Sequence, residues 1–153
     1  MGFDAARALA HKGYEVYGAA RRVALMDPLK EYGVIPLQLD VTSEESIAAC
    51  LAATGPLDVL VNCAGYGSFG AIENVPLEEG RRQMEVTLFG LAAITKKVLP
   101  GMRERGRGRI INISSVAGKA VLYFGGWYHV SKFSVEAFSD ALRIEMKPFG
   151  VDV

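Results

Sequence analysis

The chain has 153 residues, of which 50% are hydrophobic and 22% are charged, a composition that suits a single globular domain. Its 17 acidic and 17 basic residues balance, which argues against a broad polyanion-binding surface, so we expect no nucleic-acid partner. Cys50 and Cys63 do not suggest a disulfide framework. No apolar run approaches the ~18 residues needed to span a bilayer, and no signal peptide is visible. We therefore expect a cytoplasmic protein without a membrane partner.

Helix-like and strand-like segments alternate along the first third of the chain. The expected elements are a helix over Phe3–Lys12, a strand over Tyr14–Ala20, a helix over Arg22–Tyr32 interrupted near Pro28, a strand over Val34–Leu39, and a helix that begins at the Thr42–Glu45 capping box and runs to about Thr54. Pro36 cannot donate to a ladder on both sides, so we expect its strand at a sheet edge.

The alternation continues to the last residue. The expected elements are a strand over Leu57–Val61, a helix from Pro76 past Leu99, a strand over Arg109–Ile113, a helix over Gly126–Lys147, and the start of a strand over Val151–Val153. Pro100 is expected to kink or end its helix. This β/α alternation predicts an α/β fold, a doubly wound parallel sheet with helices on both faces, in one domain over residues 1–153.

A tyrosine, a lysine and a serine form the most informative motif. Tyr128 and Lys132 are four residues apart, so on a helix they share one face. A cation beside a tyrosine favours the phenolate, which makes the phenol a better acid–base group near neutral pH. Ser115 can then hydrogen-bond a substrate oxygen. The set suits proton transfer to or from an alcohol or ketone oxygen.

The ordinary interpretation of the same residues is structural. A tyrosine at helical spacing is usually a packed amphipathic side chain. Context favours the catalytic interpretation, because Ser114 and Ser115 follow the buried strand Arg109–Ile113. In doubly wound sheets, ligands bind at the carboxyl ends of the strands, which is where these serines are expected.

Further motifs agree with this interpretation. They are Asn62-Cys63-Ala64-Gly65 after a strand, Asp40-Val41 after the edge strand, Gly65-Tyr66-Gly67-Ser68-Phe69-Gly70, and Ala19-Ala20-Arg21-Arg22. Together with the spacing of Ser115, Tyr128 and Lys132, they resemble the short-chain dehydrogenase/reductase family, and most closely its hydroxysteroid-dehydrogenase-like, NADP-using branch. The resemblance covers Gly2–Val153 and implies a Rossmann-like fold.

The resemblance implies a role for each matching residue. Tyr128 would be the general acid in reduction and the base in oxidation. Lys132 would assist it and hydrogen-bond the nicotinamide ribose, and Ser115 would orient the substrate oxygen. The cofactor-binding residues would be Gly2, Arg21, Arg22, Asp40, Val41, Asn62, Ala64, Gly65, Tyr128 and Lys132, with Asp40 and Val41 at the adenine. No metal ligand is implied.

Charge at the end of the second family strand predicts the cofactor. An acidic residue there would bind the free ribose hydroxyls of NAD, whereas arginine accommodates the 2′-phosphate of NADP. Here Ala20 is followed by Arg21 and Arg22, and the planar guanidinium suits a phosphate. The alternative is that both arginines are exposed residues at a helix start. We predict NADP.

The chain also departs from the family pattern. Thr87 stands where the family usually has an asparagine that helps to hold a water in a proton relay, so the relay is expected to be weaker. Cys63 replaces the second asparagine of Asn-Asn-Ala-Gly. The family's first strand and most of its Gly-rich turn are missing, as are its last strands. We therefore expect an excerpt of a longer reading frame, or one with a misplaced start, and a gap one strand wide between Tyr14–Ala20 and Leu57–Val61.

Three hypotheses follow. The first is an NADP(H)-dependent oxidoreductase that interconverts an alcohol with a ketone or aldehyde, its partner being a small-molecule substrate. The second is a non-catalytic dinucleotide-binding or interaction module, and the third a fragment that does not fold alone. Homo-oligomers could form through the two long helices, one of which carries Val130, Phe133, Ala137, Ala141 and Ile144 on one side. His129 is expected to be an ordinary helix residue.

Overall fold

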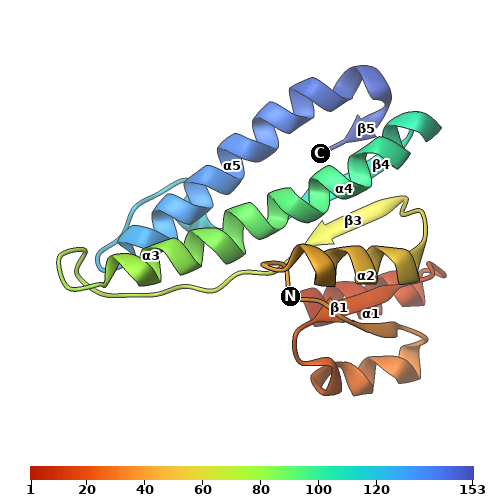
Figure 1. The fold of residues 1–153 in the computed structure, drawn as a ribbon, viewed down its shortest axis with the longest axis horizontal. Coiled ribbons are helices and arrows are strands. Elements are labelled where there is room, and N and C mark those ends of the chain that lie inside the picture. Colours follow the sequence, from red (N-terminus) through yellow and green to blue (C-terminus); the bar gives the residue numbers. More distant parts are fainter. The chain divides into compact units, whose positions relative to one another are not determined.

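All strands of the protein pair in parallel. The computed structural model describes residues 1–153, which form two compact units, Met1–Gly55 and Pro56–Val153. Helices connect the strands within each unit, so the predicted α/β class with parallel sheets is confirmed (Figure 1). The width of the gap between the first and third strands and the single domain stay predictions.

The first unit is a two-stranded parallel sheet with three helices. Its elements are α1 (Gly2–His11), β1 (Tyr17–Ala20), the 3-10 helix η1 (Val23–Tyr32), β2 (Ile35–Gln38) and α2 (Glu44–Thr54). Val16, Leu29 and Val34 form its buried core. Pro36 pairs with Gly18, and β2 hydrogen-bonds to β1 alone. The predicted edge position of Pro36 is therefore confirmed.

Two local details of this unit differ from expectation. Pro28 lies inside η1 and does not interrupt it. The cap of α2 is Ser43, one residue later than the capping box implied, and its Oγ accepts from the backbone N–H of Ser46. Thr42 instead bonds to Asp40: its Oγ1 and its backbone N–H both donate to Asp40 Oδ1, at 2.7 and 2.9 Å.

The second unit is a three-stranded parallel sheet in the order β3-β4-β5. Its elements are β3 (Val59–Asn62), α3 (Leu77–Met84), the π-helix η2 (Glu85–Phe89), α4 (Gly90–Arg105), β4 (Gly108–Asn112), the 3-10 helix η3 (Val116–Gly118), α5 (Gly126–Met146), the 3-10 helix η4 (Lys147–Phe149) and β5 (Val151–Asp152). Helix α4 packs against β3 and β4, and α5 packs against β5 (Figure 1).

The predicted long helix after Pro76 continues further than expected. Pro76 is the N-cap rather than the first helical residue. Pro100 lies inside α4, which ends only at Arg105. A proline inside a helix costs about 3 kcal/mol. Burial of Val98 and Met102 on either side of Pro100 offsets this cost, since burying each such side chain contributes about 1.5–3 kcal/mol.

The apolar stripe predicted on the last helix is not in the core of this unit. Val130, Phe133 and Ile144 are exposed, Ile144 by 76%, as are Ala137 and Ala141. The buried side of α5 carries Val135, Leu142 and Met146 together with His129 and Lys132. Helical periodicity shows that residues share a face, but it does not say which of two partly apolar faces meets the sheet.

The close approach of Gly150 to Gly106 predicts that the two glycines differ in their tolerance to substitution. Gly150 has a φ of +68°, and a Cβ there would collide with the carbonyl oxygen of Gly106. Gly106 has a φ of +66° with no neighbour within 4 Å of its would-be Cβ. Gly150→Ala should therefore destabilise the protein by about 2–5 kcal/mol, and Gly106→Ala by about 1–2 kcal/mol. Urea unfolding of both variants measures this, and equal losses would contradict the contact.

Candidate active site

The three predicted catalytic residues lie at one end of the second unit. Ser115 follows β4 after a short connection, and Tyr128 and Lys132 lie in the first two turns of α5. Helix η3, which starts directly after Ser115, packs against α5 (Figure 1). Carboxyl ends of parallel strands meet at one edge of a sheet, so this edge also carries the turn at Ala64 and Gly65 after β3.

Lys132 is the most unusual side chain of this site. It is only 6% exposed, and its Nζ donates to the carbonyl oxygen of Ile113 at 2.8 Å. The same Nζ lies 6.0 Å from the centroid of the Tyr128 ring. Burial lowers the pKa of Lys132, an effect that nearby Tyr128 partly opposes. An ammonium has three donors, and the protein supplies one acceptor, so two donors remain for a ligand.

Gly65 lies beside this ammonium and also beside Thr87. A Cβ at Gly65 would be 3.5 Å from Thr87 Oγ1 and 3.9 Å from Lys132 Nζ. Thr87 is 1% exposed, and its hydroxyl has no hydrogen-bond partner in the protein. A buried polar atom without a partner is costly, which marks it as a candidate for binding water or ligand.

Thr87 belongs to the π-helix η2. The backbone N–H of Gly90 donates to the carbonyl oxygen of Glu85, five residues earlier. Such π-helical turns inside α-helices occur frequently at functional sites. Sequence periodicity did not predict this turn, because one extra residue in a turn leaves no distinct composition signal.

Ser115 is held in an extended conformation at the start of η3. Its Oγ accepts from the backbone N–H of Ala117 at 3.2 Å. The hydroxyl proton is thus available to donate to a substrate oxygen. Gly118 fits tightly against α5, since a Cβ there would lie 3.0 Å from the carbonyl oxygen of Lys132. These contacts connect the segment after β4 to the helix that carries Tyr128.

Two loops meet beside Tyr128. The Phe69 ring lies 5.8 Å from the Tyr128 ring, centroid to centroid. The backbone N–H of Gly70 donates to the carbonyl oxygen of Phe124 at 2.7 Å, and Gly70 forms a parallel bridge with Gly125. Phe124 has a φ of 62°, a left-handed conformation that is strained for an aromatic residue. The loops after β3 and β4 are therefore joined next to the tyrosine.

A buried amide pair crosses the sheet beneath the site. The Asn62 Nδ2 donates to Thr95 Oγ1 at 3.1 Å and to Asn112 Oδ1 at 2.8 Å. The Asn112 Nδ2 donates to Ser139 Oγ at 2.9 Å. The side chain of Asn62 thus joins β3 to α4 and β4, and Asn112 extends the network to α5. The cofactor contact assigned to Asn62 would use the backbone of the turn. Sequence reasoning missed this network, because its members are 27 to 50 residues apart.

His129 was expected to be an ordinary helix residue, but it is 5% exposed and both of its ring nitrogens bond to the backbone. No spacing signal in the sequence points to this role. Cys50 and Cys63 are both free, the first buried and the second exposed in the turn after β3. Although Cys63 as a whole is exposed, desolvation of its thiol raises the pKa of that group, which makes it a poor nucleophile.

The first unit holds the other predicted cofactor residues. Its two strands are parallel, with Ala20 opposite Gln38, so Arg21 and Arg22 after β1 lie at the same edge as Asp40 and Val41 after β2. The hydrogen bonds from Thr42 lower the pKa of the Asp40 carboxyl, and the charge of Arg21 adds to this effect. Both arginines are exposed. Gly2 is the first residue of α1.

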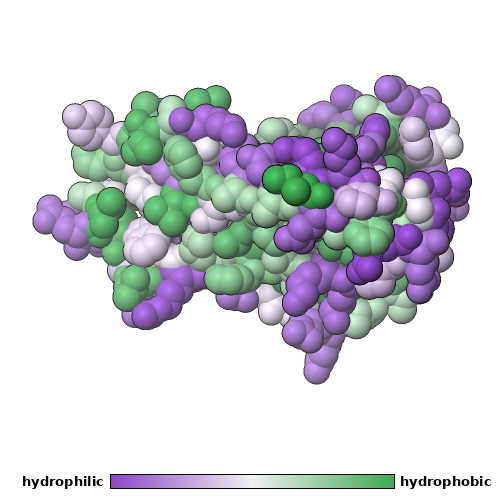
Figure 2. Space-filling view, turned by 90° about the horizontal axis from the view of Figure 1, so that it is seen from above, coloured by the Kyte–Doolittle hydropathy of each residue, from purple (hydrophilic) through white to green (hydrophobic).

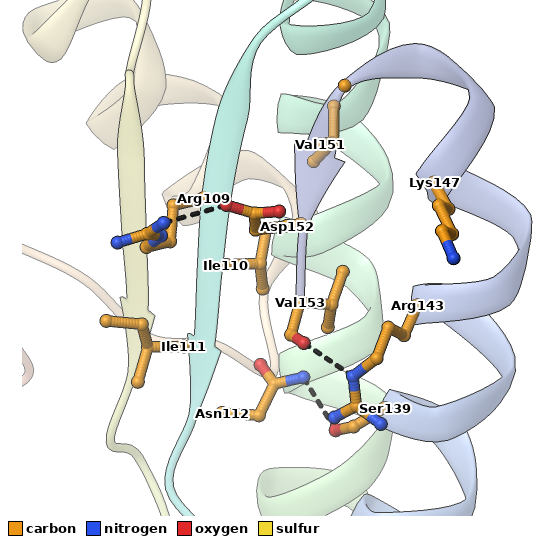
Figure 3. A pocket seen from close by; sticks show the side chains of 11 residues that line it. Arg109, Ile110, Ile111, Asn112, Ser139, Arg143, Lys147, Val151, Asp152 and Val153 are labelled. Atoms are coloured by element: carbon orange, nitrogen blue, oxygen red, sulfur yellow. Dashed lines mark hydrogen bonds and ion pairs between the residues drawn. The ribbon is translucent and has the colours of Figure 1, made fainter.

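A cavity elsewhere in the second unit is not the predicted site. It has a volume of about 620 Å³ and lies between β4, β5 and the second half of α5. Its polar groups bond to one another: Arg109 pairs with Asp152 at 2.7 Å, and Arg143 Nε donates to the carbonyl oxygen of Val153 at 2.7 Å (Figure 3). Neither Ser115 nor Tyr128 nor Lys132 lines it.

None of the helices is both long enough and apolar enough to cross a bilayer.

The chain is similar to short-chain dehydrogenases of known sequence and structure. A probable short-chain type dehydrogenase/reductase, VdlC, of Helicobacter pylori is 36% identical over 157 residues, covering 100% of this chain and 58% of VdlC. A short-chain dehydrogenase structure from Streptomyces avermitilis has a TM-score of 0.91 and 40% identity, covering 99% of this chain and 59% of that one. The closed form of serine dehydrogenase complexed with NADP+ has a TM-score of 0.87 and 32% identity, covering 95% of this chain and 62% of that one.

The chain spans little more than half the length of these relatives. The family model described as short chain dehydrogenase matches residues 1–153. The chain therefore belongs to the short-chain dehydrogenase/reductase family.

Proposed function

We propose that this chain carries the catalytic residues of an NADP(H)-dependent oxidoreductase that interconverts an alcohol with a ketone or aldehyde. The observation that carries the proposal is the buried Lys132 ammonium, which lies between the end of β4 and the Tyr128 ring with donors to spare. A buried lysine is costly for folding, and one beside a tyrosine on the same helix face suits proton transfer.

Each residue of the site would have a distinct role in the proposed reaction. In reduction, the Tyr128 hydroxyl gives its proton to the carbonyl oxygen as the carbon gains a hydride, and in oxidation the phenolate takes the proton back. Ser115 donates a hydrogen bond from its hydroxyl to the same oxygen and orients it, without transferring its proton. The Lys132 charge stabilises the phenolate. The nicotinamide, when bound, supplies or accepts the hydride.

The residues present fit such a cofactor. Gly65 keeps the backbone open beside Lys132 Nζ, and the ammonium can donate to ribose hydroxyls. The unpartnered Thr87 hydroxyl is available to hold a water near Gly65, although it offers fewer hydrogen-bonding groups than the family's usual asparagine. In the first unit, Asp40 and Val41 would contact the adenine, and Arg21 and Arg22 the 2′-phosphate.

Cofactor preference makes a separate prediction. Arg21→Asp should weaken NADP binding and shift preference towards NAD, because it replaces a phosphate-binding cation with a ribose-binding carboxylate. A charge-assisted contact of this kind is worth about 1.5–3 kcal/mol, so we expect the Kd for NADP to rise roughly tenfold to a hundredfold. Titration of both cofactors into the protein from its complete reading frame measures this.

The control for this titration is Arg7→Asp, which reverses the charge of an exposed arginine of α1 that pairs with Asp4. It should leave both affinities within about threefold of the parent. Equal affinities of the parent for NADP and NAD would remove the argument from Arg21 and Arg22.

The alternative function is a non-catalytic dinucleotide-binding module. Thr87 favours it, since the hydroxyl stands where the family relies on an asparagine. The test follows NADPH absorbance with a panel of ketones and aldehydes. Turnover supports the oxidoreductase, whereas NADPH binding without turnover of any carbonyl or alcohol would support the module.

We also propose that the protein self-associates and that it is located in the cytoplasm. The exposed apolar stripe of α5, which includes Val130, Phe133 and Ile144, would be covered in a homo-oligomer formed through the long helices. We propose the cytoplasm as the location, where NADPH is available to a reductase. Sedimentation of the protein from its complete reading frame would show whether it self-associates.

A further inference from the structure

The imidazole of His129 joins two points of the segment that follows Ser115. His129 Nδ1 lies 3.1 Å from the carbonyl oxygen of Ala117, and Nε2 lies 2.9 Å from the backbone nitrogen of Leu122. The ring is 5% exposed. One side chain of α5 thus holds both ends of Ala117–Leu122.

The partners determine the tautomer. The backbone N–H of Leu122 can only donate, so Nε2 must be the acceptor, and Nδ1 carries the proton and donates to the carbonyl oxygen of Ala117. Both bonds therefore require a neutral imidazole with its proton on Nδ1. Gly125 permits the ring to lie there, because a Cβ at this position would be 2.9 Å from Nε2.

The held segment leads directly into an exposed apolar surface beside the tyrosine. This surface, here called the apolar wall, consists of Val121, Leu122, Tyr123 and Phe124, of which Tyr123 is 93% exposed. Its far end bonds to Gly70, in the loop whose Phe69 ring contacts Tyr128. Figure 2 shows several hydrophobic residues gathered at the left of the view, the end of the second unit where α3 and α5 begin.

Another side chain also ties this segment to α5. Lys119 Nζ lies 2.7 Å from Glu136 Oε2, but the Lys119 side chain is 67% exposed. Exposed ion pairs contribute little because water and salt screen them. The buried, doubly bonded His129 is therefore the stronger tie, and Lys119 offers a matched comparison within the same segment.

We propose that His129 is a positioning residue for the substrate: it holds the segment Ala117–Leu122 so that the apolar wall stands beside Tyr128 and receives the apolar body of an alcohol or carbonyl compound. The proposal rests on the proposed oxidoreductase function. Ser115 is held separately by the hydrogen bond from the N–H of Ala117. Loss of the imidazole should therefore increase the mobility of the apolar wall more than that of Ser115. The effect should therefore fall on KM rather than on kcat.

The test compares His129→Leu with His129→Gln in the protein from its complete reading frame. Leucine fills the space without donors or acceptors, whereas the glutamine amide offers a carbonyl acceptor and an NH₂ donor group. In His129→Leu, exchange of the Leu122 amide hydrogen should become roughly tenfold to a hundredfold faster, because its buried acceptor is lost. In His129→Gln it should stay within about threefold of the parent.

Kinetics provide the second measurement. For a carbonyl with a long apolar chain, His129→Leu should raise KM roughly tenfold with little change in kcat, and for a three-carbon aldehyde it should change neither. His129→Gln should restore the parent KM. Lys119→Met and His11→Leu, which alter an exposed ion pair and the other histidine, should behave as the parent does.

A second variant guards against misfolding of His129→Leu. Gly125→Ala retains the imidazole but places a methyl group against it, so it should shift Leu122 exchange and the KM in the same direction. The one-bond ¹H–¹⁵N coupling of His129 should also place its proton on Nδ1 in the parent.

Several outcomes would overturn the proposal. These are unchanged Leu122 exchange in His129→Leu, a KM that rises equally for the small aldehyde, or no restoration by glutamine. Hydrogen exchange needs no turnover, so it tests the two hydrogen bonds of His129 independently of whether the protein is an oxidoreductase. A parent protein that reduces no carbonyl, with the Leu122 amide protected only when His129 is present, would overturn the oxidoreductase function and the wall's role in substrate binding, but not the tie.

Discussion

Tyr128→Phe should abolish carbonyl reduction and leave NADPH binding nearly intact. The substitution removes the proposed proton donor but keeps the ring that packs against Phe69. General acid catalysis contributes roughly 10²–10⁴-fold to rates, so we expect kcat to fall by at least about two orders of magnitude. The measurement is NADPH oxidation with a ketone and an aldehyde, together with the Kd for NADPH.

The controls for Tyr128→Phe separate chemistry from folding. Tyr14→Phe removes the hydroxyl of an exposed tyrosine of the first unit, and it should retain the parent kcat. Ser115→Ala should lower kcat less than Tyr128→Phe, because it removes an orienting hydrogen bond and leaves the proton donor in place. Reduction by Tyr128→Phe at the parent rate would refute the assignment and leave the binding-module interpretation.

Lys132→Met is expected to damage both catalysis and cofactor binding. It removes the ammonium beside Tyr128 and the two donors available to the cofactor ribose, while retaining most of the side-chain volume. Losing charge-assisted hydrogen bonds worth about 1.5–3 kcal/mol each should raise the Kd for NADPH roughly tenfold or more. Isothermal titration and the NADPH assay measure the two effects. Unchanged NADPH affinity would show that Lys132 does not contact the cofactor.

The pH dependence of the stability of Lys132→Met, compared with that of the parent, tests whether Lys132 is buried. Burial lowers the pKa of Lys132 in the folded protein. At pH values between this lowered pKa and the pKa of about 10.4 for a free lysine, the unfolded chain therefore binds more protons than the folded protein. The free energy of unfolding of the parent should therefore gain a contribution as pH rises through this interval. Lys132→Met lacks this contribution.

The measurement is urea unfolding of both proteins at several alkaline pH values. The stability of Lys132→Met relative to the parent should decrease as pH rises through the interval. Lys96→Met, on an exposed lysine of α4, is the matched control and should show no such trend. A relative stability of Lys132→Met that is independent of pH would contradict the burial.

Element types were predictable from local patterns, whereas their limits were not. The capping residue of α2 illustrates this. Thr42 and Ser43 are both good caps by residue type, and the choice depends on Asp40, which engages Thr42 with two hydrogen bonds. The continuation of α4 through Pro100 likewise depends on the burial of Val98 and Met102, which no local pattern reveals.

The sequence pattern of α5 likewise did not show which face of the helix is buried. Its apolar stripe through Val130 and Ile144 is exposed in the unit. The buried face mixes apolar residues with His129 and Lys132, so it has a lower apolar content than a core face usually has. A functional site uses polar groups where the core would use apolar ones, and the periodicity of the sequence is misleading there for that reason.

The sequence by itself determined the parallel β/α order, the edge position of Pro36, and the placing of Tyr128 and Lys132 on one helix face, because each depends on residues within a few positions of one another. Only the tertiary structure decided that Lys132 is buried against Ile113, that the Thr87 hydroxyl lies in a π-helical turn beside Gly65, and that His129 holds Ala117 and Leu122. Those features depend on which segments the packed core brings together, and the local sequence does not carry that information.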